Sequence, residues 1–78
     1  MAQIRLFASA REAAGAGKAE LDGSTVGEVL DEACRRFGPT FEAVLGTCNV
    51  WVNGEPADPG DPVGAGDEVA VLPPVSGG

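Results

Sequence analysis

The chain has 78 residues, of which 44% are hydrophobic, and this length fits one small globular domain. A domain of this size has too little interior to enclose a deep catalytic cavity, so its function is expected on its surface or at its ends. Twelve acidic residues against five basic ones give a formal net charge of -7, which repels a phosphate backbone and argues against nucleic acid as a partner.

Other classes of protein are disfavoured by residue types that the sequence lacks. No apolar run approaches the ~20 residues of a membrane span, and Arg5 interrupts the first apolar stretch, so we expect a cytoplasmic protein with no membrane partner. With no histidine and no C-x-x-C pair, Cys34 and Cys48 are not expected to bind a metal. We interpret both as small buried or half-buried hydrophobic residues, with a disulfide or a reactive thiol as the alternative. The usual histidine base of a Ser or Cys hydrolase is also missing.

The N-terminal segment predicts a half-buried strand over residues 3–8. Its alternating pattern places three side chains on the inner face, namely Ile4, Leu6 and Ala8. Phe7 is then expected on the outer face. Ser9 and Glu12 have the spacing of a capping box, which predicts a short helix that stops at Gly15. A brief strand is expected over residues 18–21.

The clearest helical pattern lies in the middle of the chain. Thr25 and Glu28 form another capping box, and Gly38-Pro39 supplies the end of the helix. Between them, apolar side chains recur at spacings of three and four at Val26, Val29, Leu30, Ala33 and Phe37. This stripe predicts an amphipathic helix with one face in the core.

The second half of the chain predicts a short helical turn and two strands. The turn covers residues 40–45, the first strand residues 49–53 and the last strand residues 68–72. Val50 and Val52 share one face opposite Trp51, and Asn53-Gly54 is a favourable hairpin turn. The prolines between the two strands, Pro56, Pro59 and Pro62, exclude a regular central strand there.

This order of elements indicates an α+β protein in which a small mixed sheet packs on one amphipathic helix, the outline of the β-grasp, ubiquitin-like fold. In that fold the first and last strands are parallel neighbours, so Phe7 and Leu72 would stand side by side on the face away from the helix. Trp51 is a candidate third member. Large apolar residues exposed together typically mark a protein interface, so we predict partner-binding roles for all three.

The final stretch, LPPVSGG, predicts a tail that leaves the domain. Proline fixes φ and lacks an N–H group, so Pro73-Pro74 cannot continue a strand ladder, and six residues can span roughly 20 Å. Gly77 and Gly78 lack a Cβ and could thread a narrow channel in another protein. We expect a single domain over residues 1–78 with a mobile tail over residues 73–78; a frayed terminus is the alternative. The tail residues expected to contact a partner are Pro73, Pro74, Val75 and Ser76.

Four stretches carry a resemblance to a known family over the whole chain: IRLFASAREAAG, TVGEVLDEACRRF, VNG and GDEVAVLPPVSGG. They resemble the small subunit of molybdopterin synthase, in the MoaD/ThiS family of ubiquitin-like sulfur carriers. The resemblance implies that Gly78 is adenylated by an E1-like adenylyltransferase using ATP and Mg²⁺, then converted to a thiocarboxylate with sulfur from a persulfide donor. It implies no permanently bound cofactor.

The resemblance also implies a heterotetramer with the molybdopterin synthase large subunit, to which the chain donates sulfur for the molybdopterin dithiolene. Catalytic side chains would belong to the large subunit, so the chain would not be an enzyme on its own. Pro56 stands where a bulkier aliphatic residue is often found in the family, and this departure leaves open which protein is the partner. One alternative is a ThiS-type or other carrier for thiamine, cysteine or a thiolated metabolite. Another is a ubiquitin-like interaction module or modifier without sulfur chemistry.

Overall fold

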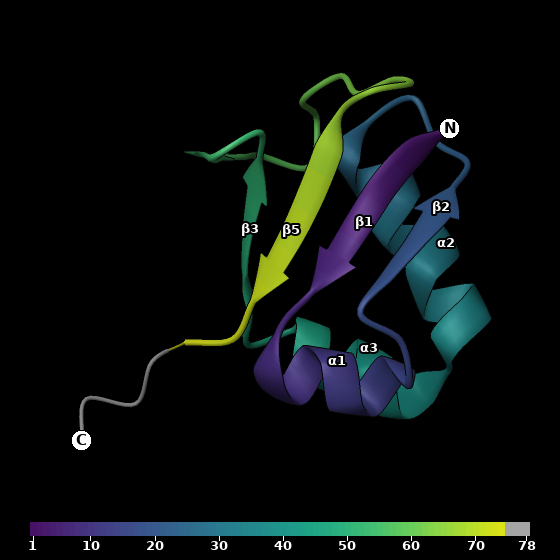
Figure 1. The fold of residues 1–78 in the computed structure, drawn as a ribbon, viewed down its shortest axis with the longest axis vertical. Coiled ribbons are helices and arrows are strands. Elements are labelled where there is room, and N and C mark those ends of the chain that lie inside the picture. Colours follow the sequence, from purple (N-terminus) through teal and green to yellow (C-terminus); the bar gives the residue numbers. More distant parts are fainter. Residues whose placement is uncertain (75–78) are drawn as a thin grey trace.

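The structure of the protein is a computed structural model, and it describes residues 1–74. Its strands are β1 (Ala2–Leu6), β2 (Lys18–Leu21), β3 (Asn49–Val52), β4 (Glu55–Pro56) and β5 (Glu68–Leu72). Its helices are α1 (Ala8–Ala14), α2 (Val26–Phe37) and α3 (Pro39–Leu45). The strands form one mixed sheet in the order β2-β1-β5-β3-β4; α2 covers one face, and α1 and α3 lie together at one end (Figure 1). The predicted β-grasp fold is confirmed.

The centre of the sheet is the parallel pair of β1 and β5. In its register Ile4 lies opposite Val69 and Leu6 lies opposite Val71. Each of these strands is flanked by an antiparallel neighbour, β2 beside β1 and β3 beside β5. Since side chains alternate between the two faces of a strand, this register gathers the apolar side chains of both central strands under α2.

The core joins the inner face of the sheet to all three helices. Its buried residues are Ala2, Ile4, Leu6, Ala10, Leu21, Val26, Val29, Ala33, Phe41, Val63, Val69 and Val71. Phe41 of α3 has the largest fully buried side chain, and its ring meets Phe37 of α2 edge-on with centroids 5.3 Å apart. Among the described residues no polar or charged residue is buried, so the side chains of the interior are held together by apolar packing.

The ends of α2 follow the sequence prediction. The Thr25 hydroxyl accepts a hydrogen bond from the Glu28 N–H at 3.2 Å, and the Glu28 carboxylate accepts one from the Ser24 N–H at 2.7 Å. The second bond reaches one residue further back than in the usual capping box. Gly38, with φ of 93°, ends α2, and Pro39 begins α3 one residue earlier than predicted. Within residues 1–74 no helix is both long and apolar enough to cross a membrane.

The prediction for the start of α1 was wrong. Ala8 does not point inward from a strand; it is exposed, has φ of 49° and is the first residue of the helix. Ser9 does not cap this helix, because Phe7 occupies the N-cap position without any side-chain capping bond. The reason is tertiary: the Phe7 N–H donates to the Val71 carbonyl at 3.3 Å, which holds Phe7 on the sheet up to the residue where the chain turns.

The β3–β4 hairpin turns at Asn53-Gly54 as predicted, with φ of 50° and 86° at these residues. The Asn53 amide also donates to the Asp67 carboxylate at 3.0 Å and accepts from the Glu68 N–H at 3.0 Å. The bond from Asn53, together with one from the Gly64 N–H, lowers the pKa of Asp67. These contacts fasten the hairpin to the start of β5.

Candidate functional site

The outer face of the sheet, away from α2, is the first part of the site. Parallel pairing places Arg5 of β1 opposite Ala70 of β5, and antiparallel pairing places Trp51 of β3 on the other side of Ala70. Their sequence neighbours in β1 and β5 point into the core, so these three side chains point outward. Trp51 is 36% exposed, although it is the largest apolar residue in the chain.

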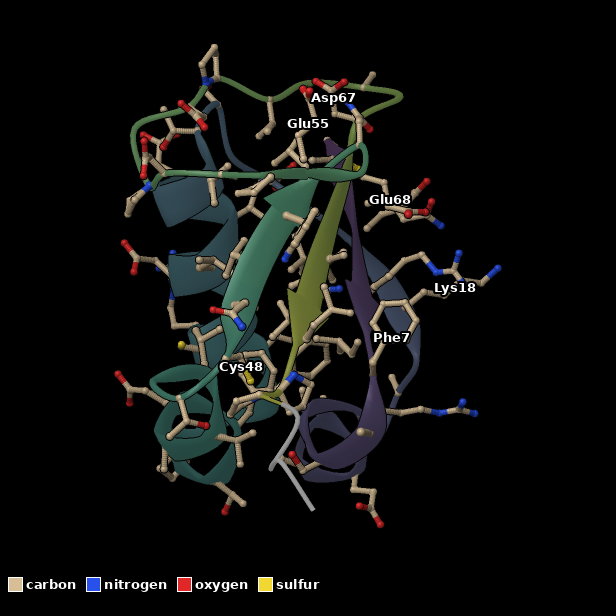
Figure 2. All side chains as sticks on the ribbon, turned by 90° about the vertical axis from the view of Figure 1, so that its left-hand side faces the viewer. Phe7, Lys18, Cys48, Glu55, Asp67 and Glu68 are labelled. Atoms are coloured by element: carbon tan, nitrogen blue, oxygen red, sulfur yellow. The ribbon has the colours of Figure 1, made fainter. Side chains whose placement is uncertain are left out.

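Phe7 and Leu72 lie in the next row of the same face. The bond from Phe7 to the Val71 carbonyl continues the parallel register by one residue, which brings Phe7 beside Leu72. Phe7 is 37% exposed and Leu72 is half-buried. Figure 2 shows Phe7 on the side of the sheet away from α2. We call Phe7, Trp51, Ala70 and Leu72 the apolar patch; it contains all three residues that the strand pattern predicts.

Two neighbours in this area were not among the predicted site residues. Ala70 lies between Arg5 and Trp51 in their row, and Pro56 of β4 lies opposite Trp51 at the exposed edge of the sheet. The outward position of Ala70 follows from the alternation of the last strand. The position of Pro56 follows from the two-residue turn at Asn53-Gly54, which fixes the hairpin register.

The tail begins at the centre of the sheet. Leu72 is the last residue of β5, which lies between β1 and β3, and it is followed by half-buried Pro73 and exposed Pro74. The remaining predicted tail residues, Val75, Ser76, Gly77 and Gly78, lie outside the described residues. Leu72, which we call the tail root, belongs to the apolar patch, so a protein that binds the tail would contact the patch at the same place.

Comparison with known proteins gives the family. The sequence profile of the ThiS family matches residues 4–78. The chain belongs to the ThiS family. Small archaeal modifier protein 1 of Haloferax volcanii is 41% identical over an alignment of 85 positions, gaps included, that covers 95% of this chain and 97% of the relative. A crystal structure of that protein has a TM-score of 0.82 at 40% identity and covers 99% of this chain and 98% of its own.

Two further solved structures are similar to this ThiS-family chain. One is the Amycolatopsis orientalis BexX/CysO complex, with a TM-score of 0.83 at 27% identity and full coverage of both chains. The other is a putative molybdopterin converting factor, subunit 1, from Pyrococcus furiosus, with a TM-score of 0.83 at 26% identity, covering 95% of this chain and 97% of that one. The protein is thus a ubiquitin-like member of a group of sulfur carriers and modifiers, and one such relative is seen in complex with another protein.

Of the two cysteines of this ThiS-family protein, Cys34 lies on α2, whereas Cys48 directly precedes Asn49, which pairs with Leu72 at the start of the tail. Cys34 on α2 and Cys48 before β3 are both free and half-buried, as interpreted from the sequence. Burial raises the pKa of both thiols; for Cys34 the carboxylates of Glu42 and Asp31 add to the effect, whereas for Cys48 a hydrogen bond from Thr47 opposes it. A raised pKa leaves little thiolate at neutral pH, so neither side chain has the character of a nucleophile.

Proposed function

We propose that the protein is a sulfur carrier whose Gly78 carboxylate is converted to a thiocarboxylate, and that it donates this sulfur to the dithiolene of molybdopterin. The observation that carries the proposal is the match to the ThiS family through residue 78, on a fold that starts its tail beside an exposed apolar patch. The similarity to a putative molybdopterin converting factor subunit supports this pathway, while the equal TM-score of the BexX/CysO complex keeps another carrier pathway as the alternative.

The chemistry needs an activated acyl carbon, because a free carboxylate spreads its negative charge over two oxygens and resists attack. In the proposed sequence, Gly78 attacks the α-phosphorus of ATP on an E1-like adenylyltransferase with bound Mg²⁺, and pyrophosphate leaves. A persulfide sulfur then attacks the acyl carbon and displaces AMP. A thiol cleaves the resulting S–S bond and releases the thiocarboxylate. After sulfur transfer, hydrolysis restores the carboxylate for another cycle.

The chain's own part in this sequence is presentation of the tail. Pro73 and Pro74 direct it away from the ladder of β5, and Gly77 and Gly78 carry no Cβ that would obstruct a narrow channel. We propose that Phe7, Trp51 and Leu72 dock on the partners while Val75 and Ser76 contact the walls of the partner's channel. The partners would be the adenylyltransferase and, in a heterotetramer, the molybdopterin synthase large subunit, which would supply the catalytic side chains.

A second candidate is attachment to other proteins. It is favoured by the 41% identity to a protein named as a small archaeal modifier. In that case a lysine amine would attack the adenylated Gly78, form an amide, lose a proton and displace AMP. Both candidates share the adenylated intermediate, so the fate of the acyl group separates them.

Intact-mass analysis tests the proposal. The full chain is co-expressed with an E1-like adenylyltransferase and a persulfide donor, and we expect a mass gain equal to the replacement of one oxygen by sulfur. The same spectrum measures whether Gly78 is the last residue, as the chemistry requires. Detection of the chain conjugated to other proteins, without any sulfur-bearing form of the chain, would favour the modifier function. Pull-down of thiazole synthase or cysteine synthase in place of the molybdopterin synthase large subunit would assign a different carrier pathway.

Phe7→Asp is expected to weaken binding to the adenylyltransferase at least about tenfold, because a charge would replace a large apolar contact beside the tail root. Titration calorimetry measures the affinity, and thermal unfolding should change little because Phe7 lies outside the core. Ala65→Asp is the matched control, since it adds the same charge in the exposed turn before β5, at the opposite end from the tail. Equal affinities for the two variants and the parent would contradict a docking role for the patch.

A further inference from the structure

The positive charges of this acidic chain are unevenly distributed. Of its five basic residues, three line one hollow of about 390 Å³ where β1, α1 and β2 meet: Arg5, Arg11 and Lys18. The other two, Arg35 and Arg36, lie in the last turn of α2. The remaining lining residues of the hollow are Leu6, Phe7 and Gly17. On a chain with a net charge of -7, this hollow is a local concentration of positive charge.

The backbone holds the hollow in shape. The Leu6 N–H donates to the Gly17 carbonyl at 2.9 Å, which ties the connection between α1 and β2 to the end of β1. A Cβ built on Gly17 would lie 3.4 Å from Nε and 3.5 Å from Cζ of Arg11, so the Arg11 guanidinium lies directly against this glycine. The Arg11 side chain therefore packs over Gly17 at one wall of the hollow.

Two of the three cations have no acidic partner within the described part of the chain. Arg5 forms an ion pair with Glu68 at 3.7 Å, with side chains that are 49% and 40% exposed, and its guanidinium also lies 5.6 Å from the centre of the Phe7 ring. Among residues 1–74 no carboxylate comes within 4.0 Å of Arg11 or Lys18. Figure 2 shows Lys18, Phe7 and Glu68 on the same side of the sheet. The hollow can thus accept a negative group from outside.

We propose that this cationic hollow binds carboxylate side chains of an acidic segment in a partner protein. The guanidinium of Arg11 can hold a carboxylate through two parallel hydrogen bonds, and Lys18 adds a flexible donor beside it. Phe7 belongs both to the wall of the hollow and to the apolar patch, so a partner seated on the patch meets the hollow at the same time. The site therefore fits a segment that places an acidic residue next to an apolar one.

The overall charge favours a protein segment over a nucleic acid. Charges are screened beyond about 8–10 Å in physiological salt, so one or two carboxylates in the hollow interact mainly with its three cations. A nucleic acid extends far past the hollow and brings many phosphates near the twelve acidic residues of the chain. This inference does not depend on the sulfur chemistry, because a carrier and a modifier would use the hollow alike.

Amide chemical shifts of the full chain, titrated with a hexaglutamate peptide, test the proposal. We expect saturable shifts that centre on Arg5, Arg11, Gly17 and Lys18 and that weaken as salt is added. The double variant Arg11→Gln/Lys18→Gln should bind about fivefold more weakly or worse, the effect of losing exposed ion pairs. The matched control, Arg35→Gln/Arg36→Gln, removes the same charge from α2 and should bind like the parent; the spectra also report whether each variant is folded.

Three results would overturn the proposal. The first is an equal loss of affinity for the peptide in both double variants, which would indicate that the peptide responds only to the net charge of the chain. The second is the absence of any saturable shift at low salt. The third is a stronger response of the same amides to inorganic phosphate or to a short single-stranded DNA than to the peptide, which would assign the hollow to phosphate groups.

Discussion

Deletion of Gly78 is expected to abolish sulfur loading of the chain and to leave its unfolding transition unchanged. The truncated chain still ends in a glycine carboxylate, but this group stands about 3.3–3.6 Å short of its former position. Reacting atoms must be held within a fraction of that distance, so the shortened tail cannot present its carboxylate for adenylation. Intact mass after co-expression measures loading, and urea unfolding measures stability.

Two companion variants separate the length of the tail from its composition. Deletion of Ser76 keeps both glycines but shortens the tail equally, so it should also fail to load. Gly78→Ala keeps the length and adds one methyl group, and it should load slowly if the channel of the activating enzyme is narrow. Efficient loading of either deletion variant, or a marked fall in the stability of the Gly78 deletion, would contradict the proposed separation of tail and fold.

Phe41→Ala is expected to destabilise the domain by about 3–5 kcal/mol, the usual cost of deleting a buried aromatic side chain. Phe41 is a core residue with an exposed fraction of 0%, and its ring packs edge-on against Phe37 of α2. Small domains have total stabilities near the low end of about 5–15 kcal/mol, so this variant should be close to unfolding at 25 °C. Urea denaturation followed by the fluorescence of Trp51 measures the change.

Phe7→Ala is the matched control for this result, because it removes the same side chain from the outer face. Phe7 is already 37% exposed, and the loss should remain below about 1 kcal/mol. Phe41→Leu, which keeps most of the apolar volume, should fall between the two and remains measurable if the alanine variant does not fold. Similar losses for Phe41→Ala and Phe7→Ala would contradict the distinction between a packed core and an outer patch that contributes little to stability.

These two groups of variants address separate parts of the molecule. Phe41 and its neighbours determine whether the sheet and helices assemble. The tail and the apolar patch lie outside that core, and in the proposed function they determine which protein the chain meets and what chemistry follows. A small domain can serve a reaction in this way without enclosing a catalytic cavity, since a partner supplies it.

The sequence predicted those elements whose signals are local. The Thr25 cap, the apolar stripe of α2 and the Asn53-Gly54 turn all depend on residues within a few positions of one another, and the structure confirms each of them. The alternation of the last strand placed Val69 and Val71 in the core. The capping pattern at Ser9 failed because a bond from Phe7 to a strand remote in sequence determines where the chain leaves the sheet.

By itself, then, the sequence determined the β-grasp order of elements, the buried face of each main element and the unusual composition of the tail. Tertiary structure alone decided that the tail starts between β1 and β3, and that Arg5, Arg11 and Lys18 share one hollow. The physical reason is that hydrophobic periodicity and capping act over a few residues. Strand register and loop path, in contrast, join residues far apart in the chain, and no local pattern specifies which distant side chains will meet.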